Sequence, residues 1–171
     1  MAITESQVRH PLDPLTASEI ERAVALVRAE ERLSARARFT LVWLREPDKH
    51  VVRTFGEGDH VPREVLMTVL DKEVERVYRI RVSLSDERIV SWDEIPGVQP
   101  PVFGEEWDEA EAAAKADAGF IEGCKKRGID DLTHVFVDPV SAGNFGFPDE
   151  VGRRLVRGVA YWREDGTDNG Y

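Results

Sequence analysis

The chain has 171 residues, of which 42% are apolar and 33% are charged, and a formal net charge of −10. This length suits one large domain or two small ones. The acidic balance disfavours nucleic acid and anionic membranes as partners, because phosphate contacts need clustered Lys and Arg. The sequence has neither a signal-peptide pattern nor an apolar run of about 20 residues, which predicts a cytoplasmic protein without a membrane helix.

Residues 10–95 are expected to form a first α+β unit, preceded by a loose tail at 1–9. Thr16 and Glu19 form a T-x-x-E capping box, which predicts a helix over about 17–31 with one buried face. Runs rich in β-formers then alternate with turns, and the predicted strands are 37–44, 51–55, 65–70, 77–84 and 89–92. A helix followed by an antiparallel meander predicts that the helix covers one face of the sheet.

Residues 96–102 hold three of the prolines and are expected to be a linker, because this composition breaks helix and strand alike. Residues 103–171 are expected to repeat the order of helix and then strands. A helix is predicted over 105–127, kinked near 117–119, with Gly128 as its left-handed C-cap. The predicted strands of this second unit are 132–138 and 153–163.

Both faces of the 153–163 strand are apolar. Leu155, Val159 and Tyr161 alternate on one face, and Val156, Ala160 and Trp162 alternate on the other. This pattern predicts that the helix covers one face and a neighbouring domain the other. With that domain absent, an exposed edge and an apolar face would favour self-association of the chain.

Residues that could perform chemistry are sparse. The four histidines show none of the i,i+2 or i,i+4 spacings that place two imidazoles on one metal; they are His10, His50, His60 and His134. The single cysteine, Cys124, follows Phe120 and Ile121 on a helix face and is expected in the core rather than as a nucleophile. We therefore assign no catalytic residue, no metal ligand and no cofactor-binding residue.

An ordered series of segments nevertheless resembles a known family. The segments are 10–15, 82–84, 90–92, 95–102, 105–107, 126–129, 137–143, 157–161 and 168–171. Their order and spacing resemble the second and third N-terminal domains of the copper- and topaquinone-containing primary amine oxidases. The resemblance implies two tandem cystatin-like units, each a long helix on an antiparallel sheet, with the second unit incomplete.

The resemblance also implies a parent enzyme that oxidises primary amines to aldehydes, releasing ammonia and hydrogen peroxide. That chemistry uses copper held by three histidines and topaquinone formed from a tyrosine in an Asn-Tyr motif, all in a C-terminal catalytic domain. This chain has no His-x-His, and its nearest approach to Asn-Tyr is Asn169-Gly170-Tyr171. The chain alone is therefore expected to be inactive, with the catalytic domain of the parent as its partner.

Trp107 and Val140 fall at positions that border the substrate channel in the family, although both would also suit simple packing between domains. Two functions remain open. The first is a truncated amine oxidase that lacks its catalytic domain. The second is a free-standing cystatin-like binding module without activity. The first is favoured, because a free-standing module should have a complete sheet in its second unit. This sequence instead stops where the family continues into further strands.

Overall fold

The computed structural model describes residues 10–56, 58–60, 62–143, 145–165 and 167. The predicted tail at 1–9 and the family-like segment at 168–171 lie outside these residues. The chain divides into two compact units, Met1–Pro100 and Pro101–Tyr171, which are called unit 1 and unit 2 below.

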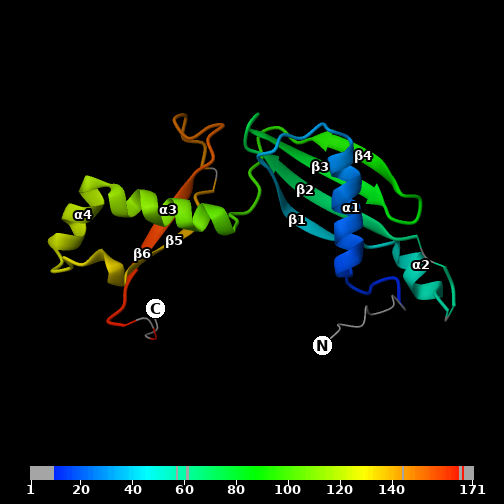
Figure 1. Cartoon of the computed structure of the whole chain (residues 1–171), viewed down its shortest axis with the longest axis horizontal. Helices are drawn as coiled ribbons and strands as arrows, with labels where there is room; N and C mark the ends of the chain where they lie inside the picture. Colours follow the sequence, from blue (N-terminus) through cyan, green and yellow to red (C-terminus); the bar gives the residue numbers. More distant parts are fainter. Residues whose placement is uncertain (1–9, 57, 61, 144, 166, 168–171) are drawn as a thin grey trace. The chain divides into compact units, whose positions relative to one another are not determined.

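Unit 1 is a helix packed on a four-stranded antiparallel sheet, with strands in the order β1-β2-β3-β4. Its elements are α1 (Ala17–Ala29), β1 (Ala37–Arg45), α2 (Lys49–Thr54), β2 (Glu64–Asp71), β3 (Arg76–Ser83) and β4 (Arg88–Glu94). Figure 1 shows α1 lying across one face of this sheet. The α+β prediction of a helix followed by a meander is confirmed for unit 1.

The core of unit 1 lies between α1 and the sheet. Val27 of α1, Met67 of β2 and Ile80 of β3 are completely buried there. Met67 and Ile80 are direct partners across the β2–β3 ladder, so both side chains lie on the face that α1 covers. Burying a side chain of this size contributes about 1.5–3 kcal/mol, which makes this layer the main source of stability in unit 1.

The N-terminus of α1 forms the predicted capping box. The Glu19 backbone N–H donates to Thr16 Oγ1 at 3.2 Å, and the Thr16 backbone N–H donates to Glu19 Oε2 at 2.8 Å. Each side chain therefore satisfies a backbone donor that the helix leaves open. The helix begins at Ala17, within the predicted range.

Glu19 has a second partner that the sequence pattern does not reveal. Its carboxylate accepts hydrogen bonds from Arg63 Nε at 2.9 Å and from Arg63 Nη2 at 3.0 Å. The same guanidinium donates to the carbonyl oxygens of Pro11, Asp13 and Pro14, so it joins the segment before α1 to the start of β2. Both charged side chains are nearly buried, with exposed fractions of 10% and 11%.

The prediction of a strand at 51–55 is wrong, because residues Lys49–Thr54 form the short helix α2. Val51 and Val52 favour strands, but strand preference depends on having a neighbouring strand to pair with. Here the segment follows Pro47-Asp48, and the Val52 N–H donates to the Asp48 carbonyl in a helical turn. No residue of α2 is buried, so no core contact favours the extended form.

Unit 2 consists of two helices, a 3₁₀ turn and a two-stranded antiparallel sheet in the part of the chain that is described. Its elements are α3 (Gly104–Ala116), α4 (Ala118–Lys125), η1 (Leu132–His134), β5 (Val135–Ser141) and β6 (Val156–Trp162). Within unit 2, α3 packs mainly against β5 (Figure 1). The order of helix and then strands agrees with the sequence-based expectation for this unit.

The helix predicted over 105–127 is divided into two at the predicted kink. Asp117 has an extended backbone, with φ −77° and ψ 127°, and its side chain accepts the Phe120 N–H at 2.8 Å. It therefore ends α3 and caps α4, in keeping with the preference of Asp for cap positions. Gly128 adopts φ +79°, as a left-handed C-cap requires, and the Ile129 N–H returns to the Cys124 carbonyl.

Candidate functional site

A metal ion needs particular groupings of side chains around it. Among the residues that the structure describes, no three His, Cys, Asp or Glu side chains are grouped so that they could hold a metal ion. The described residues therefore do not fit a copper site, and we derive no chemical step through copper within this chain.

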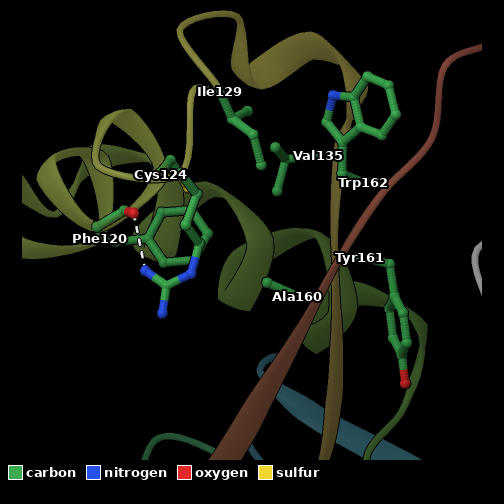
Figure 2. Close-up of a pocket in the computed structure, with 9 residues that line it drawn as sticks. Phe120, Cys124, Ile129, Val135, Ala160, Tyr161 and Trp162 are labelled. Atoms are coloured by element: carbon green, nitrogen blue, oxygen red, sulfur yellow. Dashed lines mark hydrogen bonds between the residues drawn. The ribbon is translucent and has the colours of Figure 1, made fainter.

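Unit 2 contains an open pocket of about 460 Å³ between α4 and the β5–β6 sheet (Figure 2). It is lined mainly by apolar side chains, among them Phe120, Cys124, Ile129, Val135 and Trp162. Cys124 is buried, as predicted, and lies with Phe120 on the wall that α4 forms, whereas Ile129 follows the helix. The charged Arg127 closes one side, and its Nη1 donates to the Gly123 carbonyl at 2.8 Å.

Trp107 lies at the end of the first turn of α3 and is 46% exposed. The neighbouring Glu106 holds this turn in place. Its carboxylate accepts from Arg154 Nε and Nη2 and from the Phe103 backbone N–H. Arg154 also donates to the Pro101 carbonyl at 3.0 Å. The sequence pattern did not single out the Glu106–Arg154 pair, because the two residues are 48 positions apart.

Val140 lies near the end of β5 and is 42% exposed. It is paired across the ladder with Arg157 of β6. The connection after β5 adds exposed apolar side chains, namely Phe145, Phe147 and Val151. Trp107 and Val140 therefore both lie on the surface of unit 2, on two elements that pack against each other.

The two edges of the β5–β6 sheet differ in their free backbone groups. At the outer edge of β5, the Val135 N–H donates to the Leu132 carbonyl and the Val137 N–H donates to Glu111 Oε2 at 3.1 Å. Pro139 has no N–H to offer there. The first five residues of β5 therefore present no free N–H along this edge.

The ionised carboxylate of Glu111 satisfies a backbone donor at that edge. Burial alone would raise its pKa, but hydrogen bonds from Lys115 and from the Val137 N–H outweigh burial and hold the pKa below its ordinary value of 4.5. Lys115 donates to Glu111 Oε1 at 2.8 Å, and Arg163 stacks 3.4 Å from the centre of the Phe136 ring. Glu111 thus binds the outer edge of β5, while Lys115 and Arg163 lie against the Phe136 ring of the same strand.

The opposite edge of the sheet is formed by β6. The Arg163 N–H donates to the His134 carbonyl and the Ala142 N–H donates to the Leu155 carbonyl, which establishes the hydrogen-bonded pairs of the ladder. By alternation, the backbone groups of Val156, Gly158, Ala160 and Trp162 point away from β5. Within the described residues, no further strand pairs with this edge.

Two family models match the chain. Residues 16–92 match the AGAO-like N2 domain, and residues 105–171 match the N3 domain of copper amine oxidases. These matches define the chain as a tandem pair of amine-oxidase N-terminal domains.

Full-length relatives agree. The chain is 36% identical to a primary amine oxidase from Arthrobacter sp. (strain P1), over 96% of this chain and 25% of that protein. It is 34% identical to a peroxisomal copper-containing diamine oxidase from Nicotiana tabacum, over 99% of this chain and 26% of that protein. The chain belongs to the copper amine oxidase family and forms its N-terminal region, as the sequence resemblance indicated.

A solved structure shows the same fold. A copper-containing benzylamine oxidase from Hansenula polymorpha matches with a TM-score of 0.71 and 21% identity, over 95% of this chain and 26% of that one. The chain thus spans about a quarter of the length of the relatives that it matches. No helix in the described part of the chain is both long and apolar enough to cross a bilayer.

Proposed function

We propose that this chain is the non-catalytic N-terminal region of a cytoplasmic enzyme that oxidises primary amines to aldehydes with release of ammonia and hydrogen peroxide. The observation that carries the proposal is the pair of consecutive domain matches, which account for residues 16–92 and 105–171. The copper and the topaquinone of such an enzyme belong to its catalytic domain, which is the partner that we propose for this chain.

We further propose the domain assignment of 10–95 and 103–171 as separate cystatin-like domains joined by a linker at 96–102. The division into two compact units supports it. Limited proteolysis should cut the native chain first within 96–102 and leave two fragments that resist further cleavage. First cuts within either domain would contradict the assignment.

Two measurements test the assignment to an amine oxidase. Reading the coding sequence beyond the Tyr171 codon should reveal an in-frame Asn-Tyr motif and a His-x-His. An in-frame stop codon would instead favour the free-standing binding module. The purified chain, loaded with copper under oxygen, should release no amine-dependent peroxide above a boiled control. Release of peroxide would show a catalytic site that the proposal denies.

We propose that Trp107 and Val140 border the substrate channel of the parent. Their exposure on unit 2 supports this, because surface residues of this size are free to line a passage in a larger protein. In the full-length enzyme, Trp107→Ala and Val140→Ala should change KM more for bulky amines than for methylamine, while quinone content stays constant. Trp43→Ala is the matched control, because Trp43 is equally exposed but lies on unit 1. An equal effect of all three variants would remove Trp107 and Val140 from the channel.

Self-association of the chain is also proposed, because β6 carries exposed apolar side chains on both of its faces.

A further inference from the structure

The ion pair between Glu106 and Arg154 joins parts of unit 2 that lie far apart in the sequence. Arg154 Nε and Nη2 donate to the two oxygens of the Glu106 carboxylate, and Nη2 also donates to the Pro101 carbonyl at 3.0 Å. The same guanidinium lies 5.9 Å from the centre of the Phe103 ring. One arginine, placed just before β6, therefore holds both the segment that leads into α3 and the first turn of α3.

The start of α3 depends on this pair because the helix lacks a conventional cap. The residue at its N-cap position is Phe103, whose ring offers no acceptor for the N–H groups of the first turn. The Glu106 carboxylate supplies part of what is missing. It accepts the Phe103 N–H at 3.3 Å and lies where the helix dipole favours a negative charge. Arg154 holds this carboxylate in place from its other side.

Burial separates this pair from a surface ion pair of the same unit. The side chains of Glu106 and Arg154 are 12% and 22% exposed, whereas those of Glu122 and Lys126 are 67% and 70% exposed. A two-pronged arginine–carboxylate pair fixes the geometry of both groups as well as their charge. An exposed lysine pair contributes little and leaves both side chains mobile. The Glu106–Arg154 pair is therefore a fixed point of unit 2.

We propose that Arg154 is a positioning residue for Trp107: through Glu106 it fixes the first turn of α3, and with it the place of the indole at the border of the substrate channel. The inference rests on the proposed function, because it takes Trp107 as a channel residue. Trp107 directly follows Glu106 and is 46% exposed, so packing within unit 2 restrains its ring only in part. The backbone of the first turn has to supply the remaining restraint.

Kinetics of the full-length enzyme test the inference with Arg154→Met, which cannot pair with Glu106. We expect the ratio of KM for benzylamine to KM for methylamine to shift about fivefold, in the same direction as in Trp107→Ala, while quinone content stays constant. Arg153→Met is the matched control, because Arg153 is the neighbouring arginine, is exposed, and donates to the Asp149 carbonyl within the same loop. Its KM ratio should stay within about twofold of the parent value.

A double variant separates positioning from a general loss of stability. If Arg154 acts through Trp107, adding Arg154→Met to Trp107→Ala should shift the KM ratio by less than about twofold, because the indole is already gone. A further shift as large as that of Arg154→Met alone would overturn the inference. Glu106→Gln should shift the ratio less than Arg154→Met, because its amide oxygen can still accept the Phe103 N–H.

Hydrogen exchange of the same enzyme tests the structural half of the inference. In Arg154→Met, the segment 101–107 should exchange about tenfold faster, because Glu106 is no longer held where it accepts the Phe103 N–H. Arg153→Met should leave this exchange unchanged. Either unchanged exchange in Arg154→Met, or faster exchange with an unchanged KM ratio, would overturn the inference. A KM ratio that is unchanged in Trp107→Ala as well would instead show that the channel assignment is wrong, and the inference would fall with it.

Discussion

The two units follow one plan, a helix on an antiparallel sheet, but they bury their side chains very differently. In unit 1, β2 and β3 place Val65, Met67, Val69, Ile80 and Val82 beneath α1 with no exposure. In unit 2, six of the seven residues of β6 are exposed. The same order of elements therefore does not ensure a buried core, because the number of buried side chains depends on how many strands pack against the helix.

The largest expected effect is the loss of unfolding free energy when the buried Arg63–Glu19 ion pair of unit 1 is broken. Arg63→Met leaves the Glu19 carboxylate nearly buried without its partner, and we expect unit 1 to lose about 3–5 kcal/mol of unfolding free energy. Hydrogen exchange of the β2 and β3 amides measures this loss without a contribution from unit 2. Arg22→Met is the control, because its pair with Glu87 is more than half exposed and should contribute less than about 1 kcal/mol. Equal losses for the two variants would mean that burial of the pair does not matter.

Acid should weaken unit 1 through the same carboxylate. Burial would raise the pKa of Glu19, but the hydrogen bonds from Arg63 and Thr16 and the charge of Arg63 outweigh it, so the pKa lies below its ordinary value of 4.5. A carboxyl group whose folded pKa is lowered adds stability above its unfolded pKa and loses it as the pH falls through the folded pKa. The contribution should therefore be complete at neutral pH and should decline from about pH 4.5 downward.

The loss on acidification should be smaller than that of Arg63→Met, because a neutral carboxyl group still accepts hydrogen bonds. Denaturant titrations of unit 1 between neutral and acidic pH measure it, and Glu19→Gln should flatten this part of the profile. An unchanged profile in Glu19→Gln would assign the acid sensitivity to other carboxylates, among them Asp71, whose burial would raise its pKa but whose hydrogen bonds from Ser34 hold the pKa below its ordinary value.

Unit 2 should be most sensitive at Gly158, where the Val137 side chain of the neighbouring strand lies close to the glycine. A Cβ at this position would lie 2.8 Å from Val137 Cγ1, so Gly158→Ala forces the stiff Val137 side chain or its strand to shift and should cost about 1–3 kcal/mol. Gly123→Ala is the control within the same unit. Its added Cβ meets only Arg127 Nη1 at 3.7 Å, and alanine should stabilise α4 by about 0.5–1 kcal/mol. The thermal unfolding midpoints of the two variants should shift in opposite directions; a shift in the same direction would contradict the predicted clash between residue 158 and the Val137 side chain.

The smallest effect concerns the closed edge of β5. Glu111→Ala removes the acceptor of the Val137 N–H and should cost unit 2 about 1 kcal/mol. The Val137 amide should then exchange faster with solvent. Glu111→Gln keeps an acceptor oxygen and should preserve most of its protection. If both variants leave the exchange of Val137 unchanged, Glu111 does not protect this edge.

Much of the fold could be predicted from local sequence. The capping box of Thr16 and Glu19, the cap at Gly128 and the alternation at 77–84 each follow from the conformational preferences of a few neighbouring residues. The family resemblance carried the assignment further than these patterns could, because an ordered series of segments specifies the fold and not only its elements. The four histidines carry no spacing signal, so the sequence assigned no catalytic residue to this chain.

The sequence by itself determined the α+β class, the order of helix and strands in each unit and the positions of the helix caps. Only the tertiary structure decided that Lys49–Thr54 is helical, that Arg63 reaches Glu19 and that Glu111 closes the edge of β5. Caps and alternation depend on residues within about one helical turn, whereas these three features depend on whether a distant strand, carboxylate or N–H comes within reach. Such pairings join residues up to 44 positions apart, and no local pattern records them.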